Sequence, residues 1–144
     1  MMKKALELAR KSAHEGEVPV GCLVTGPDGR IIGRGRNRRE TAKNALAHAE
    51  IEAIGEACRS RGDWRLDGCS LYVTLEPCAM CAGAVINSRI SRVFYGAKEP
   101  LSGACGSVLN LFMEFQNSAA VVGGVLEREC ADVLEEFFKR VREK

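Results

Sequence analysis

The sequence predicts an α/β domain in three layers, in which helices cover both faces of a central mixed sheet of about five strands. Helical and strand-like patterns alternate in the order α-β-β-α-β-α-β-(α)-β-α. The chain is 46% apolar and 28% charged, which is typical of a globular protein, and 144 residues can bury a core without disulfide staples. No repeat, linker or low-complexity segment interrupts the pattern, so we expect residues 1–144 to form a single domain.

The first expected elements are a helix and a β-hairpin. Apolar residues recur at helical spacing over 3–15, and Gly16 ends that segment. The segments 18–25 and 30–36 are typical of strands, and the turn sequence Gly26-Pro27-Asp28-Gly29 lies between them.

A second helix, a buried strand and a third helix are expected next. Asn44 is the predicted N-cap of an Ala- and Glu-rich helix that runs through Cys58 and ends at Arg61-Gly62-Asp63. Residues 69–75 predict a buried strand, and Pro77 then fixes the first turn of a helix over 78–88.

The last third of the chain predicts shorter elements and a closing helix. A strand over 93–95 leads into a glycine-containing loop over 96–106, and Ser107 is the predicted cap of a short helix. A final strand over 119–122 precedes a helix over 126–141.

The charge balance excludes several classes of partner. The chain has 21 Lys and Arg against 19 Asp and Glu, a formal net charge of +2. This balance gives no strong attraction to a polyanion, so we expect no binding to duplex DNA, although it is compatible with a local basic patch. No uncharged apolar run is long enough to span a bilayer, so no membrane partner is expected.

The seven cysteines are an odd number, in a chain that begins with a charged amphipathic stretch and no apolar leader. This usage predicts a reducing, cytoplasmic location. Cys78 and Cys81 form a Cys-x-x-Cys pair. The others stand alone among apolar or small residues and are interpreted as buried packing residues: Cys22, Cys58, Cys69, Cys105 and Cys130.

Two short motifs carry the predicted chemistry, and each lies at the start of an expected helix: His48-Ala49-Glu50 and Pro77-Cys78-Ala79-Met80-Cys81. Cys78 and Cys81 are three residues apart and share a helical face, so both thiols can bind one ion. Helical side chains tilt toward the N-terminus, which lets His48 and Glu50 both reach a point beyond the helix end. A helix N-terminus also favours thiolate over thiol.

The number of candidate ligands indicates a catalytic metal site. A structural zinc site needs four protein ligands, whereas a catalytic one keeps a position for water, and only His48, Cys78 and Cys81 are found. The other histidine, His14, lies within the opening helix, where a surface or packing role is expected. Glu50, beside the open position, can take a proton from an activated water. A metal-free cysteine pair and a structural zinc knuckle are the alternatives that the spacing leaves open.

These motifs resemble those of the bacterial tRNA-specific adenosine deaminases, which belong to the zinc-dependent cytidine and deoxycytidylate deaminase superfamily. Similar segments run along nearly the whole chain: 17–21, 36–38, 47–50, 63–66, 71–78, 81–84, 89–90, 95–97, 103–107, 110–111, 124–126 and 129–130. The resemblance implies a cytidine-deaminase-like fold, one Zn²⁺ per subunit and a homodimer. It also implies hydrolytic conversion of adenosine to inosine at the wobble position of a tRNA anticodon, with the anticodon stem-loop as partner.

The resemblance assigns roles to residues around the metal. His48, Cys78 and Cys81 would hold Zn²⁺, and Glu50 would shuttle protons while activated water attacks C6 of adenine.

It also assigns substrate contacts. Asn37 matches a family asparagine that touches the flipped base, although an asparagine beside a turn is also a common turn former. Ala49 and Glu99 are further expected substrate contacts. For the RNA, Arg89, Arg92, Lys98 and the basic tail 139–144 are predicted to line one groove; alternatively, the tail is a solvated helix end favoured by the helix dipole.

The sequence departs from the family pattern at three places. Ala45-Leu46 replace a Pro-Thr pair, Glu99 replaces an Asp near the substrate ribose, and Phe115-Gln116-Asn117-Ser118 stands where the family has Phe-Asn-His-Arg. Losing a guanidinium near RNA removes a contact that serine cannot replace. A deaminase of the same fold acting on a free base or nucleoside, such as guanine, cytosine or adenine, is therefore an alternative. A non-catalytic zinc-stabilised binding module is a second one, although Glu50 argues against it.

Overall fold

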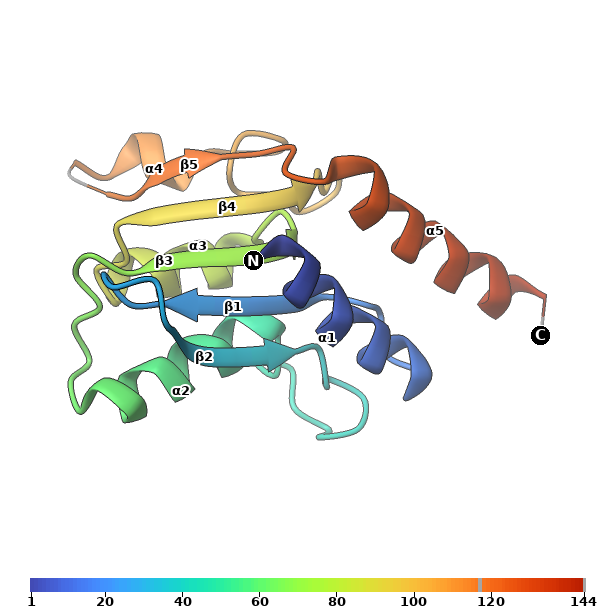
Figure 1. Ribbon diagram of the computed structural model, residues 1–144. Helices are drawn as coiled ribbons and strands as arrows, with labels where there is room; N and C mark the ends of the chain where they lie inside the picture. The colour runs from blue at the N-terminus through green and yellow to red at the C-terminus, as the bar shows by residue number, and fades with distance from the viewer. Residues whose placement is uncertain (117, 144) are drawn as a thin grey trace.

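A five-stranded sheet forms the centre of the molecule, in the strand order β2-β1-β3-β4-β5. Figure 1 shows it in the computed structural model, which describes residues 1–116 and 118–143. β1 is antiparallel to β2 and β3, whereas β3, β4 and β5 are parallel, so the sheet is mixed as predicted. The strands are β1 (Gly21–Thr25), β2 (Ile31–Arg36), β3 (Ser70–Leu75), β4 (Arg92–Ala97) and β5 (Ala120–Val122).

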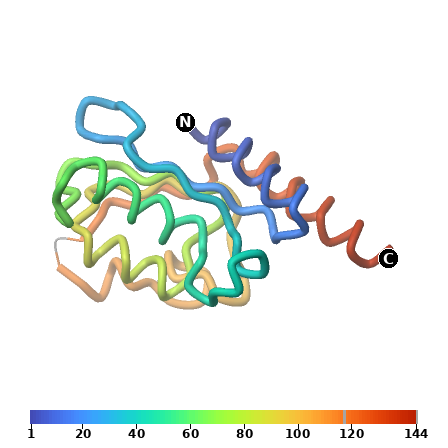
Figure 2. The backbone as a smooth tube through the Cα atoms, turned by 90° about the horizontal axis from the view of Figure 1, so that it is seen from below, coloured from blue at the N-terminus to red at the C-terminus, as the bar shows by residue number. Residues whose placement is uncertain are grey.

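Helices cover both faces of the sheet, which confirms the three-layer α/β/α class (Figure 2). α1 (Met2–His14) and α5 (Glu127–Arg142) lie on one face. α2 (Ala49–Arg61) and α3 (Ala79–Asn87) lie on the other, with the short α4 (Leu111–Glu114) beside α3. None of the described helices is long and apolar enough to cross a membrane.

The side chains of β1 alternate between two apolar cores, as the period of a strand requires. Leu23 packs in the core between the sheet and α1 and α5, whereas Cys22 and Val24 pack in the core under α2 and α3. The cysteines interpreted as packing residues are buried except Cys58, which is only half-buried, and all are free thiols.

α2 lies directly on β2 because small residues face one another across the interface. A Cβ atom on Gly33 or Gly35 would collide with backbone atoms of α2. The helix presents Ala49, Ala53 and Ala57 there, four residues apart on one face and fully buried. This close contact sets the position of the first turn of α2.

Two predicted helix caps are wrong. α2 begins at Ala49 with His48 as its N-cap residue, and Asn44 instead accepts a hydrogen bond from the Leu46 N–H (2.9 Å) in a tight turn. The short helix α4 is capped by Asn110, whose side chain accepts from the Phe112 N–H (3.1 Å). The Ser107 hydroxyl donates to the Glu76 carboxylate, so a tertiary partner takes the group that would have capped a helix.

The sheet has two chemically different ends. At the first, α2 and α3 begin and β2, β3 and β4 finish; we call it the pocket end. At the opposite end, α2 and α3 finish, β3 and β4 begin, and the turn at 26–30 joins β1 to β2; we call it the far end.

Candidate active site

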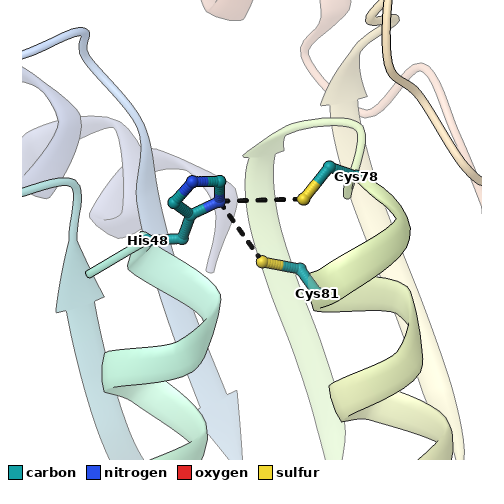
Figure 3. Close-up of side chains that lie close together, drawn as sticks. All are labelled: His48, Cys78 and Cys81. Carbon is teal, nitrogen blue, oxygen red and sulfur yellow. Dashed lines mark hydrogen bonds between the residues drawn. The ribbon is translucent and has the colours of Figure 1, made fainter. Parts of the chain in front are cut away.

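His48, Cys78 and Cys81 meet at the pocket end. His48 and Cys78 immediately precede α2 and α3, and Cys81 lies in the first turn of α3. The His48 Nδ1 atom is 3.7 Å from the Cys78 Sγ and 3.5 Å from the Cys81 Sγ (Figure 3). One donor atom from each of the three residues lies within 4.8 Å of the others.

These separations suit a tetrahedral zinc ion. Zn–S bonds of about 2.3 Å and Zn–N bonds of about 2.1 Å, at a tetrahedral angle, place nitrogen and sulfur ligands about 3.6 Å apart. The two N–S distances of the cluster, 3.5 and 3.7 Å, bracket that value. The donor chemistry, one imidazole and two thiols, is also typical of zinc.

The protonation of the cluster prepares it for a cation. Hydrogen bonds from the Cys81 thiol and the His48 ring lower the pKa of Cys78 to about 3. The same bond to Cys78, together with burial, raises the pKa of Cys81. The pKa of His48 is raised, chiefly by its hydrogen bond to Cys78. Cys78 is therefore a thiolate at neutral pH, which is the form that binds metal.

Glu50 lies beside the cluster without being one of its three members. It occupies the first turn of α2 and is 4% exposed. Burial raises the pKa of its carboxyl to about 7. A carboxyl with a pKa near neutrality can both accept and donate a proton, as general acid–base catalysis requires.

A pocket of about 160 Å³ opens over these residues. Its walls come from the loops that follow α1, β2 and β4, from the end of β3, and from the residues at the start of α2 and α3. The lining residues are Val18, Val20, Asn37, Arg39, His48, Ala49, Glu50, Leu75, Glu76, Cys78, Glu99 and Ser102.

All three predicted substrate contacts line this pocket. The Asn37 side chain donates to the Val18 carbonyl (3.1 Å) and accepts from the Arg39 N–H (3.2 Å), so it also shapes its loop. Ala49 is fully buried. Glu99 is half-buried and accepts from the Leu101 N–H (2.9 Å).

Glu76 is a buried carboxylate that sequence reasoning missed. It is 2% exposed and accepts hydrogen bonds from the N–H groups of Glu99 (3.1 Å), Cys105 (2.9 Å) and Ser107 (3.2 Å) as well as from the Ser107 hydroxyl. It therefore fixes the wall of the pocket that follows β4. Its position directly before Pro77-Cys78 was the only available signal.

Glu17 does the same for the opposite wall. It is 1% exposed and accepts from the N–H groups of Glu40 (3.1 Å) and Thr41 (2.6 Å). Burial alone would raise the pKa of Glu17, but the hydrogen bonds from Thr41 and Glu40 lower it. Nothing in the local sequence distinguishes this residue from an exposed glutamate after a helix.

The predicted single RNA groove is wrong. Arg92 begins β4 and Lys98 follows its last residue, so they lie at opposite ends of the sheet, and Arg89 lies at the far end with Arg92. Lys139, Arg140 and Arg142 are exposed on the part of α5 that extends past the sheet (Figure 1); Lys144 lies outside the described residues.

In the altered segment 115–118, Phe115 is 52% exposed and the Ser118 hydroxyl donates to the Phe112 carbonyl (2.7 Å), whereas Asn117 is outside the described residues.

Residues 1–97 match the zinc-binding region of the cytidine and deoxycytidylate deaminases. The chain belongs to this deaminase family. The deaminase is 49% identical over 145 residues to the tRNA-specific adenosine deaminase of Bacillus subtilis, a match that covers 99% of this chain and 89% of that protein.

Solved structures agree with this placement. The deaminase is similar to a tRNA:A34 deaminase studied for A-to-I editing at the wobble position of transfer RNA, with a TM-score of 0.86 and 41% identity over 92% of this chain and 97% of that one. It is also similar to the guanine deaminase of Nitrosomonas europaea, with a TM-score of 0.83 but 27% identity, over 94% of this chain and 81% of that one.

Proposed function

We propose that the deaminase converts adenosine to inosine at the wobble position of a tRNA anticodon. The observation that carries this function is a buried, non-ligand Glu50 beside a three-ligand cluster, in a chain similar over its whole length to tRNA-specific adenosine deaminases. The reaction consumes water and releases ammonia.

His48, Cys78 and Cys81 would hold one zinc ion per chain. When bound, zinc supplies a Lewis acid that lowers the pKa of water and makes it a nucleophile at neutral pH. Glu50 takes a proton from the water, delivers it to N1 of adenine, and passes the second proton to the departing amino group. The low exposure of Glu50 keeps these transfers away from bulk solvent.

The proposed substrate contacts are Asn37, Ala49 and Glu99. Asn37 and Glu99 stand on the two loops that Glu17 and Glu76 fix, so the base enters between walls that are already in place. Ala49 contributes a small side chain to the pocket lining, where a larger one would occupy the space of the base.

A homodimer is part of the proposal. An apolar groove crosses the outer surface of α2 and α3, and no described element covers it; its lining is Leu46, Ile51, Met80, Gly83, Ala84, Ile86, Asn87 and Phe115. Leu46 is 58% and Phe115 52% exposed, which is costly for a monomer. We assign the groove to a second copy of the chain, and M80E is expected to yield monomers in analytical ultracentrifugation.

Residues 1–144 act in this proposal as one catalytic domain. Its substrate is a cytoplasmic RNA, and neither duplex DNA nor a membrane is a partner.

The proposed function is tested by incubating the zinc-loaded protein with an anticodon stem-loop that carries adenosine at the wobble position. Inosine and an equal amount of ammonia are expected, and an RNA without inosine after prolonged incubation would refute the substrate.

A second candidate is deamination of a free nucleobase. The similarity to a guanine deaminase and the Glu99 replacement favour it. Ammonia release from adenine, guanine, cytosine and their nucleosides, measured beside the stem-loop, separates the two: rapid turnover of a small molecule with none on RNA would establish the second.

A further inference from the structure

An aromatic and basic cluster lies at the far end, away from the pocket. We call it the far-end patch: Arg61, Trp64, Arg65, Arg89 and Arg92, all exposed. Trp64 is the only tryptophan of the chain and is 50% exposed. Half of a large aromatic surface is therefore open to a ligand.

Two guanidinium groups stack on Trp64. The Arg65 Cζ lies 4.5 Å and the Arg89 Cζ 5.6 Å from the ring centroid, both within cation–π range. Arg89 reaches this position with a φ of 66°, in the left-handed region that non-glycine residues rarely adopt. The neighbouring Leu66 N–H donates to the Ser88 carbonyl (2.7 Å), which ties the Trp64 loop to the end of α3.

The other two arginines are held in place by uncharged acceptors. Arg61 donates to the Asp67 carbonyl and the Cys69 Sγ, each at 3.0 Å. Arg92 donates to the Ser70 hydroxyl and the Gly68 carbonyl, each at 2.9 Å. Each guanidinium carries five N–H donors in a fixed fork, so each keeps donors free for a ligand. Because these hydrogen bonds already order both side chains in the folded protein, ligand binding loses little of their conformational entropy.

Three of the four arginines of the patch, Arg61, Arg89 and Arg92, have no carboxylate partner among the described residues. At the pocket end, Arg36 and Arg38 bind Glu15 and Glu52, each at 2.8 Å. Of the four arginines of the far-end patch, only Arg65 has a carboxylate partner among the described residues, Asp63 at 3.3 Å; the pair Arg30–Asp28 (3.6 Å) lies in the turn at 26–30, outside the patch. Among the described residues, no carboxylate oxygen lies within 4.0 Å of the Arg61, Arg89 or Arg92 side chains.

Stabilisation of helix ends accounts for only part of this arrangement. α2 and α3 finish at the far end, and their dipoles favour cations there. That effect explains a charge near the ends but not a half-exposed indole, nor a guanidinium stacked on it. Aromatic and guanidinium planes side by side are instead the combination that binds RNA, through base stacking and phosphate contacts.

We propose that the far-end patch is a second RNA-binding surface. It holds the phosphate backbone and one unpaired base of the substrate RNA, at nucleotides other than the one that occupies the pocket of the same chain. β3 has six residues and so separates the two sites by about 20 Å. The inference rests on the proposed function, because that function supplies an RNA long enough to reach both.

Trp64 makes the proposal directly measurable, because the only tryptophan reports on the patch and not on the pocket. Titration of the zinc-loaded protein with tRNA is expected to quench Trp64 emission saturably. The R61Q/R89Q variant is expected to raise Kd and KM on the order of tenfold, leave kcat unchanged, and reduce the slope of log K against log salt by about 2. R89Q alone, which keeps both Arg61 contacts, is expected to show about half that loss of slope.

R34Q/R128Q is the matched control, since it removes the same charge from exposed sites on β2 and α5. Equal affinity and salt slope in the two double variants would overturn the proposal, and so would Trp64 emission that ignores RNA. If RNA quenches Trp64 and R61Q/R89Q weakens binding while no inosine forms, the proposed function fails and the patch stands. If R61Q/R89Q forms inosine normally and its RNA affinity is unchanged, the patch fails and the proposed function stands.

Discussion

The pocket end and the far end use charge in opposite ways. At the pocket end the key carboxylates are withdrawn from water: Glu17, Glu50 and Glu76 are 1%, 4% and 2% exposed. In the far-end patch the charges are exposed arginines, and among the described residues only Arg65 has a carboxylate partner, Asp63. Buried groups can hold loops and move protons because water does not compete for them. Exposed, unpaired groups are suited to recognition, because they exchange only water and counterions for a ligand.

The largest effect is expected from Glu50→Ala, which removes the proton carrier of the pocket end. We expect kcat to fall by about 10²- to 10⁴-fold, the usual contribution of a general acid–base. Zinc content, melting temperature and the response of Trp64 to RNA are expected to stay close to those of the unmodified protein. A variant that keeps its activity would show that another group moves the protons.

Glu17→Gln tests whether a buried carboxylate holds the pocket wall. The amide cannot accept hydrogen bonds at both positions, so stability at pH 7 is expected to fall by about 1–3 kcal/mol in urea unfolding. E15Q is the control: Glu15 pairs with Arg36 at the surface, and its loss should cost about 0–1 kcal/mol.

The Glu17 effect should depend on pH in a defined direction. Because its pKa is lowered in the fold, Glu17 stabilises the protein fully above its ordinary value of 4.5, and this stabilisation is lost as pH falls through the folded-state pKa. The difference between the unmodified protein and E17Q is therefore expected to shrink below pH 4.5. A difference that stays constant down to pH 3 would mean that packing, and not charge, carries the effect.

Gly35→Ala tests whether the close contact between β2 and α2 sets the positions of His48 and Glu50 at the pocket end. Its Cβ would meet the backbone of Ala49 and Ala53, so we expect a loss of about 1–3 kcal/mol and a lower kcat, because His48 and Glu50 move with the helix. G55A, inside the same helix, has only the Arg59 guanidinium within 4 Å and should stabilise by about 0.4–1 kcal/mol. Equal stability of the two variants would show that the interface adapts.

The smallest effect is expected from Arg128→Ala on α5, an exposed residue that belongs neither to the pocket lining nor to the far-end patch. The exposed pair with Asp132 spans 3.9 Å, and its loss should change stability by less than about 0.5 kcal/mol. Activity and RNA affinity should not change. The stability, activity and RNA affinity of this variant are the reference values for judging substitutions at the pocket end and the far end. A larger change in any of these quantities would show that α5 contributes to one of the two ends.

Local signals were sufficient for most of the fold and for the zinc cluster. The hairpin turn and the Gly62 stop of α2 depend on backbone preferences of single residues, whereas Pro77, predicted to fix the first turn of α3, precedes the N-cap residue Cys78 and lies outside that turn. The start of α2 could not be read in this way, because Asn44 has the chemistry of a cap. The Asn44 side chain is used in a local turn instead, and the start of α2 depends on the contact of Ala49 with Gly35, which lies on another element.

The sequence by itself determined the ligand types, their spacing and the presence of a carboxylate two residues after His48, because short-range geometry places such groups at a helix start. Only the tertiary structure decided that Glu50 is buried, that Glu17 and Glu76 hold the pocket walls, and that Arg89 and Arg92 lie away from Lys98. These properties depend on which strand ends and helix ends share one side of the sheet. Burial and charge pairing arise from such long-range contacts, which no local pattern encodes.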